Sequence, residues 1–228
     1  MENKKNSVYS SFMFLKLQPE FRRLVSNEKI AAKQEFENMV GALQEKIFLR
    51  TYMVAGRADS DILFWRMSDD LAYLQDVCAR TFSSGVGRYF TTSYSFLGGY
   101  RPPADKRPED LEFGFLPKNA FGRHRYMLLH PVIKSNTWYE LPEAERENLM
   151  AERAKVIAGH NDINENIFYS YGLDEQEMLV EREARTIEDL IAATQELRKL
   201  RIKAHTVLDK PVFLCLGRDL REIMDAIG

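Results

Sequence analysis

Two side chains that could bind a charged ligand or a metal lie on one predicted helix, which begins at Pro142. Arg153 and His160 are seven residues apart, nearly two helical turns, so both would point the same way about 10 Å apart. A guanidinium binds carboxylates and phosphates, and a neutral imidazole is the commonest protein ligand of metal ions. Two ordinary roles stay open. Arg153 could form a surface ion pair, and His160, which follows Gly159, could interact with the dipole of a helix end.

Further basic and aromatic side chains precede this helix. With Arg153, the side chains of His130 and Lys134 could gather an anionic small-molecule substrate. The alternative for Lys134 is a solvated lysine at the end of a strand, because lysine is rarely buried. Trp138 and Tyr139 follow, and their ordinary role is packing in a core.

Composition and charge exclude several classes of protein. The 228 residues carry 32 basic and 34 acidic side chains, a net charge of −2, which gives no electrostatic reason to expect nucleic acid as a partner. Cys78 and Cys215 are far apart and outside any CxxC motif, as expected of thiols in a reducing compartment. No signal-peptide core and no apolar run of about 18 residues is found. We therefore expect a cytoplasmic protein with no membrane partner.

Hydrophobic periodicity predicts an alternation of strands and helices in the first part of the chain. The predicted elements are strand 8–17, helix 27–45, strands 47–55 and 61–67, a helix from residues 68–69, and strand 88–98. This βαββαβ order is the ferredoxin-like arrangement, an antiparallel sheet with helices on one face.

The second part of the chain repeats the plan. Its predicted elements are strand 125–133, the helix from Pro142, strands 167–171 and 178–184, a helix from Thr186, strand 205–217 and a closing helix 220–227. Residues 101–121 are rich in proline and charge and read as a linker or functional loop. We therefore predict an α+β fold of two ferredoxin-like halves, 1–110 and 111–228, whose sheets pair as a dimeric α+β barrel.

Ordered motifs from both halves resemble one protein family, the chlorite dismutases and their coproporphyrin-haem decarboxylase relatives. The motifs are GRY at 87–89, YS at 94–95 and LG at 97–98; then PVIK at 131–134, WYELP at 138–142, ER at 145–146, LM at 149–150, SYGLD at 170–174 and KPVF at 210–213. Each motif alone is weak, but the ordered set is specific. The resemblance implies homopentamers of such duplicated chains, with haem or coproporphyrin haem in the C-terminal half.

The resemblance also assigns positions in the cofactor pocket. The family's iron ligand is the histidine of an L-M-x-x-H pattern, and here residues 149–153 read LMAER, so Arg153 stands at that position. A guanidinium has no lone pair to give to iron; His160 is the one candidate for a displaced iron ligand. Glu183 stands where some relatives have a glutamate that orients the ligand histidine, so we expect a buried Arg153–Glu183 ion pair and a possible gain of haem binding in Arg153→His.

Other pocket positions follow from the same resemblance. His130 stands where decarboxylase relatives have a reactive tyrosine, and Lys134 matches a lysine beside a propionate. Trp138 and Tyr139 match aromatic residues that line the pocket. The distal arginine that chlorite decomposition requires falls at Glu165 or Asn166, according to the direction of counting. A carboxylate there would repel chlorite, so we do not expect chlorite degradation.

These assignments predict a haem-binding oxidoreductase of the decarboxylase- or peroxidase-like kind rather than a true chlorite dismutase. Its catalytic residues would be His130 and Lys134. Cofactor-binding residues would be Arg153, Glu183, Trp138, Tyr139 and Glu165. The residues themselves favour the alternatives: a non-haem descendant that acts as a pentameric binding or scaffold protein, or one that binds another anionic small molecule.

Overall fold

The structure is a computed structural model that describes residues 7–101 and 107–228. The chain forms two compact units, Met1–Gly122 together with Leu216–Gly228, and Arg123–Cys215. We call them unit 1 and unit 2. The first boundary lies after Gly122, whereas the halves were expected to meet at residue 110. The chain also returns to unit 1 within its last strand, and the closing helix packs there. Part of the predicted linker, 102–106, lies outside the described residues.

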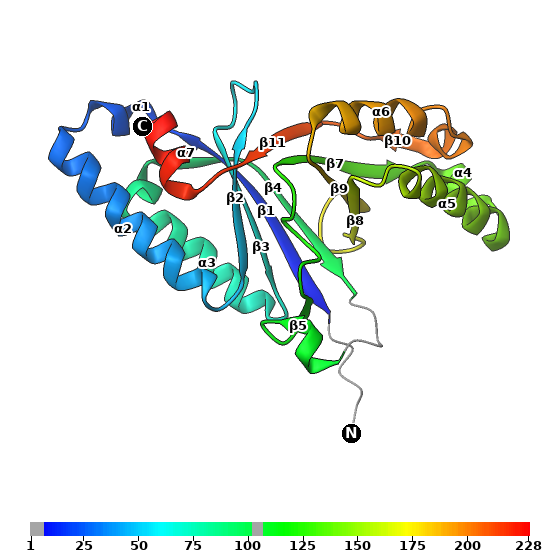
Figure 1. Ribbon diagram of the computed structural model, residues 1–228, viewed down its shortest axis with the longest axis horizontal. Coiled ribbons are helices and arrows are strands. Elements are labelled where there is room, and N and C mark those ends of the chain that lie inside the picture. The colour runs from blue at the N-terminus through cyan, green and yellow to red at the C-terminus, as the bar shows by residue number, and fades with distance from the viewer. Residues whose placement is uncertain (1–6, 102–106) are drawn as a thin grey trace. The chain divides into compact units, whose positions relative to one another are not determined.

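Unit 1 is a four-stranded antiparallel sheet with helices on one face (Figure 1). Its elements are β1 (Val8–Leu17), α1 (Pro19–Arg23), α2 (Ser26–Gln44), β2 (Phe48–Val54), β3 (Ile62–Ser68), α3 (Leu71–Ser83), β4 (Phe90–Tyr100) and α7 (Leu220–Ile227). The strand order is β2-β3-β1-β4, with every neighbouring pair antiparallel. The first strand therefore lies inside the sheet between the third and the fourth, as the βαββαβ plan requires.

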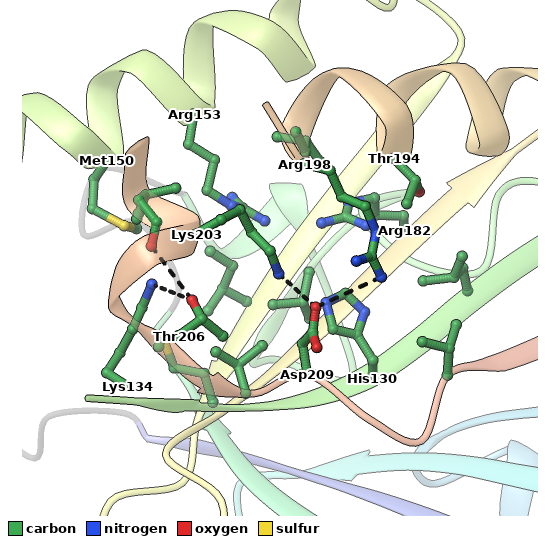
Figure 2. Close-up of a pocket in the computed structure, with 18 residues that line it drawn as sticks. His130, Lys134, Met150, Arg153, Arg182, Thr194, Arg198, Lys203, Thr206 and Asp209 are labelled. Atoms are coloured by element: carbon green, nitrogen blue, oxygen red, sulfur yellow. Dashed lines mark hydrogen bonds and ion pairs between the residues drawn. The ribbon is translucent and has the colours of Figure 1, made fainter. Parts of the chain in front are cut away.

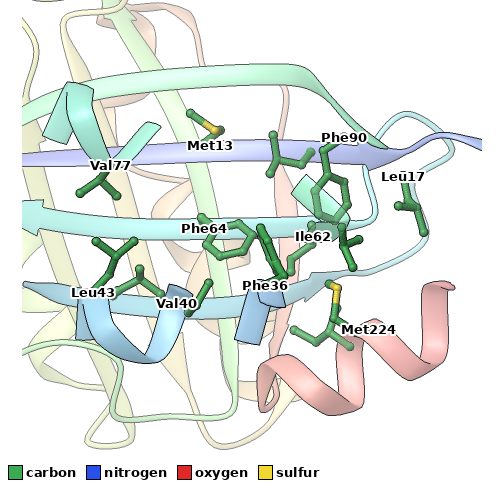
Figure 3. Packing of buried hydrophobic residues seen from close by; sticks show 14 of the residues in the cluster. Met13, Leu17, Phe36, Val40, Leu43, Ile62, Phe64, Val77, Phe90 and Met224 are labelled. Atoms are coloured by element: carbon green, nitrogen blue, oxygen red, sulfur yellow. The ribbon is translucent and has the colours of Figure 1, made fainter. Parts of the chain in front are cut away.

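The core of unit 1 lies between this sheet and α2, α3 and α7 (Figure 3). Phe36 of α2 packs edge-on against Phe64 of β3, with ring centroids 5.9 Å apart. A 3-10 turn, Gly85–Tyr89, approaches the helices so closely that a Cβ on Gly87 would lie 1.7 Å from the carbonyl oxygen of Thr81. Glycine is therefore required in the GRY motif by packing.

Unit 2 repeats the same strand order. Its elements are β7 (Tyr126–Lys134), α4 (Asn136–Glu140), α5 (Glu143–Ala158), β8 (Ile163–Tyr169), β9 (Met178–Ala184), α6 (Ile187–Leu197), the 3-10 turn η3 (Arg201–His205), β10 (Thr206–Leu208) and β11 (Phe213–Gly217), within which the chain returns to unit 1. β8, β9, β7 and β10 are neighbours in that order and antiparallel. A 3-10 turn, Pro108–Asp110, and a hairpin of β5 (Leu111–Glu112) and β6 (Leu116–Pro117) lie between β4 and β7.

The predicted order of the main helices and strands is confirmed in both halves, and several details differ. The strand predicted at 205–217 is two strands, because residues 209–212 leave the ladder around Pro211. The short helix α1 was not predicted. Pro142 precedes α5 as its cap instead of opening its first turn. Within the described residues, no helix is both long and apolar enough to cross a membrane.

Candidate binding pocket

Unit 2 contains a cavity of about 90 Å³ between its sheet and α5, α6 and η3 (Figure 2). Its lining combines apolar and basic side chains. The basic ones are Lys134, Arg153, Arg182, Arg198 and Lys203, and the single acidic one is Asp209. The apolar ones are Leu128, Val132, Met150, Ile167, Met178, Val180, Leu197, Ile202 and Val212.

Strand and helix periodicity explain which side chains reach this cavity. Alternate residues of a strand share a face, so β7 presents His130, Val132 and Lys134 to the cavity and β9 presents Val180 and Arg182. α5 contributes Met150 and Arg153, which are three residues apart and therefore neighbours on its surface. α6, η3 and the segment after η3 supply the remaining wall.

Arg153 and Glu165 form a bidentate ion pair. Nη1 and Nη2 of Arg153 each donate to one carboxylate oxygen of Glu165, both at 2.5 Å. Nε of Arg182 donates to the same carboxylate at 2.6 Å. The three side chains are 13%, 8% and 6% exposed, so one buried carboxylate compensates two buried guanidinium groups.

A second carboxylate compensates two other basic groups of the pocket. Asp209 lies 2.5 Å from Nζ of Lys203 and 4.0 Å from Nη2 of Arg198. The hydrogen bond from Lys203 holds the pKa of Asp209 below its usual value, although burial opposes this. Asp209 is therefore ionised at neutral pH.

Lys134 differs from the other basic residues because no carboxylate in the described chain forms an ion pair with it. Its Nζ lies 3.3 Å from Oγ1 of Thr206 and 4.6 Å from the ring centroid of Trp138. The residue is buried. Burial, together with the charges of Arg153 and Lys203, lowers the pKa of Lys134 to about 8.

His130 is also buried and lines the cavity, and within the described part of the chain its Nδ1 has no hydrogen-bond partner. Burial, helped by the charge of Arg182, holds the pKa of His130 well below its usual value. The imidazole is therefore neutral at pH 7.

The expected Arg153–Glu183 pair is wrong, because Arg153 pairs with Glu165. Glu183 follows Arg182 on β9 and therefore points to the opposite face of the strand. Its Oε2 accepts hydrogen bonds from the backbone N–H groups of Arg123 at 2.6 Å and His124 at 3.1 Å. Glu183 thus fixes the chain at the start of unit 2.

The remaining predicted residues have other surroundings. Trp138 is buried against Leu149 and Ile202, beneath Lys134. Tyr139 is 45% exposed, and its hydroxyl donates to that of Tyr171 at 3.3 Å. Nε2 of His160 lies 3.3 Å from Glu196, and His160 does not line the cavity.

No metal-binding cluster is evident in the part of the chain that the structure describes. No group of three or more His, Cys, Asp or Glu side chains there is arranged to hold a metal ion.

Four charged residues of the pocket were not predicted: Arg182, Arg198, Lys203 and Asp209. Only Arg182 had a signal in the sequence, since it continues the alternate apolar positions Met178 and Val180 of a predicted strand. Arg198 lies at the end of α6, Lys203 on η3 and Asp209 on the segment after β10. At these positions apolar periodicity does not indicate where a side chain points.

A duplicated ferredoxin-like α+β chain with a basic pocket in its second half is the class of protein that these observations define. The family model for chlorite dismutase matches residues 29–218, and the chain belongs to this family. Coproheme decarboxylase of Mycolicibacterium smegmatis is 27% identical over 168 residues, which cover 71% of this chain and 69% of that protein.

Solved structures share the fold over nearly the whole chain. Chlorite dismutase from Candidatus Nitrospira defluvii in complex with imidazole has a TM-score of 0.83 at 19% identity, covering 96% of this chain and 94% of that one. A mutant of the chlorite dismutase from the same organism has a TM-score of 0.83 at 20% identity, covering 96% and 95%. The predicted fold class and family are thereby confirmed.

The residues of this pocket do not fit an iron porphyrin. Arg153, at the position that the resemblance assigns to the iron ligand, offers only donors. The distal position falls at Glu165 or Asn166, and Glu165 is in direct contact with Arg153. A porphyrin between these two positions would have to separate them. The cavity of about 90 Å³ is also well below the roughly 300–1,000 Å³ of typical small-molecule clefts.

Proposed function

We propose that this chain is a non-haem member of the chlorite dismutase family whose unit 2 pocket binds a small organic anion. The Arg153–Glu165 ion pair is the observation that carries the proposal. It joins two side chains that, by the resemblance, would lie on opposite sides of a haem plane. A buried pair of this kind keeps both charges compensated, and inserting a cofactor would expose each of them to an uncharged surface.

The charge of the pocket supports an anion as the ligand. Five basic side chains line it, and two carboxylates, Glu165 and Asp209, compensate four of them. The amine of Lys134 forms no ion pair with a residue that the structure describes, so a bound carboxylate or phosphate would complete the balance. The apolar wall formed by Val132, Ile202 and similar residues favours a ligand that also has a short hydrocarbon part.

The competing function is a haem-binding oxidoreductase of the decarboxylase- or peroxidase-like kind, with His130 and Lys134 as catalytic residues. Membership of the family and the likeness to a coproheme decarboxylase favour it. His130 is the residue that could take part, because its neutral imidazole reaches the cavity. Against it stand the contact between Arg153 and Glu165 and the small cavity.

Absorption spectra separate the two functions. The purified protein is titrated with haem and with coproporphyrin haem, beside the Mycolicibacterium coproheme decarboxylase as a positive control. We expect a saturable Soret band from the control only. In parallel, pyruvate, acetate and phosphate should raise the melting temperature of this protein, since binding to the folded state stabilises it. A one-to-one haem complex with a sharp Soret band would refute the proposal.

We further propose a cytoplasmic homopentamer, as the resemblance implies. Light scattering at micromolar concentrations tests the assembly. A monomer or dimer mass across that range would contradict it.

A further inference from the structure

We propose that Lys134 forms an imine with its ligand, and that the pocket therefore takes a small oxo acid, a carboxylate that also carries a ketone or aldehyde carbonyl. This inference rests on the anion pocket proposed above and adds a covalent step to it. It follows from the surroundings of a single amine.

Among the basic residues of the pocket, Lys134 is the one whose amine forms no ion pair in the described chain, although the carboxylate of Glu177 binds its backbone N–H at 2.7 Å. Its amine is buried between a hydroxyl, Oγ1 of Thr206 at 3.3 Å, and the face of Trp138 at 4.6 Å. Neither group neutralises a full positive charge. A buried lysine that lacks a counterion and lies near other cations is the type that serves as a nucleophile toward carbonyl compounds.

The neighbouring cations lower the pKa of Lys134, as burial does. Burial, then Arg153 and Lys203, lower the pKa of Lys134 to about 8, although the charge of Glu177 opposes this. At pH 7 about one amine in ten is then neutral, against fewer than one in about a thousand for an ordinary lysine with a pKa of about 10.4. The pocket thus supplies a nucleophilic amine at neutral pH without a separate base.

Arg153 and Lys203 pair with Glu165 and Asp209 but keep further N–H donors, since a guanidinium has five and an ammonium three, and these donors would hold the carboxylate of the ligand. Both residues line the cavity together with Lys134, and Figure 2 shows the amine of Lys203 directed toward Asp209. With its carboxylate near these groups, a short oxo acid would present its carbonyl carbon to Nζ of Lys134. A ligand without a carboxylate would form no charge-assisted hydrogen bonds with these donors and would bind less tightly.

The reaction is a condensation that needs no other reactant. The lone pair of Nζ attacks the carbonyl carbon, which forms a C–N bond and a carbinolamine; the Thr206 hydroxyl is close enough to hydrogen-bond the new oxygen. The carbinolamine oxygen takes up a proton from solvent and leaves as water, and the nitrogen lone pair forms the C=N bond. The product is a protonated imine, and no oxidation or reduction has occurred.

Borohydride trapping tests the step. The full-length protein is incubated with pyruvate and sodium borohydride, which reduces the imine to a stable secondary amine, and the adduct is located by mass spectrometry of the intact protein and its peptides. We expect one adduct per chain, on Lys134, and none with acetate. Lys134→Arg should abolish it, whereas Lys155→Arg, on the exposed side of α5, should leave it unchanged.

The pH profile of the wild-type protein gives a second readout that does not depend on a variant. The trapping rate at Lys134 should rise about fivefold between pH 7 and 8 and level off above pH 9, because the neutral fraction saturates near a pKa of about 8. Surface lysines should continue to rise about tenfold per pH unit over this range.

Two failures can be distinguished. If pyruvate raises the melting temperature but no adduct appears on Lys134, or labelling is spread equally over surface lysines, the imine is refuted and the anion pocket stands. If neither pyruvate nor acetate stabilises the protein and haem binds one to one, the proposed function fails, and the inference fails with it.

Discussion

Replacing Glu165 by glutamine should strongly destabilise the protein. This carboxylate accepts hydrogen bonds from Arg153 at 2.5 Å and Arg182 at 2.6 Å, and all three side chains are at least 87% buried. Glutamine keeps the shape but removes the charge, so two guanidinium groups lose the one carboxylate that pairs with them in the described residues. Breaking one buried pair in this way costs about 3–5 kcal/mol.

For a chain of this length, about 1 kcal/mol corresponds to about 2–4 °C in melting temperature, so the expected loss is about 6–20 °C. Urea unfolding gives the free energy directly by linear extrapolation. Glu152→Gln is the matched control. Glu152 precedes Arg153 on α5 and pairs with Arg201 at 2.7 Å, but both side chains are largely exposed, and water screens such a pair.

A double-mutant cycle isolates the pair itself. Arg153→Met and Glu165→Gln, made singly and together, should show a coupling energy of more than about 1 kcal/mol, because the two side chains are in contact. Equal stabilities of Glu165→Gln and Glu152→Gln would refute the reasoning. So would additive effects in the cycle, since they would mean that the bidentate contact does not exist in solution.

Three further perturbations follow from the charges. Arg66→Met should stabilise the protein by roughly 1–3 kcal/mol in urea unfolding, because Arg66 is fully buried and its Nε and Nη1 have no hydrogen-bond partner among the residues described; a loss of stability would contradict this. His130 must stay neutral in the fold but is protonated below about pH 6.5 when unfolded, so stability should fall as pH drops from 7.5 to 5.5, and His130→Leu should flatten that profile. Acetate binding, measured by calorimetry, should weaken as pH rises through about 8 and Lys134 loses its charge, whereas in Lys134→Arg it should not.

The order of helices and strands could be predicted because it depends on local signals. Apolar spacing marks α2 and α3, and side-chain caps mark helix starts: Asp70 accepts from the backbone N–H groups of Ala72 and Tyr73, and Thr186 accepts from Asp189. The interruption around Pro211 was missed because apolar residues lie on both sides of it. Periodicity does not report where a ladder ends.

The composition of the pocket could be predicted only in part. His130, Lys134 and Arg153 were each recognised as candidates, and the structure brings all three to one cavity. The partner of Arg153 was not recognised, because the distance between a helix and a strand depends on packing and not on spacing along the chain. Glu165 was considered only as a distal residue, whereas in the fold it contacts the residue at the ligand position.

This contact also changes what a single substitution can restore. The expectation that Arg153→His would bind haem assumed that Glu183 is placed to orient the new imidazole. Glu183 instead accepts hydrogen bonds from backbone N–H groups on the far side of β9, and the residue of β9 that faces α5 is Arg182. A histidine at position 153 would lie beside Glu165, which keeps its ion pair with Arg182. Glu165 would stabilise the protonated form of this imidazole, and a protonated imidazole has no lone pair to give to iron. Arg153 and Glu165 form a buried ion pair in this chain, so a pocket for iron would require changes at both positions.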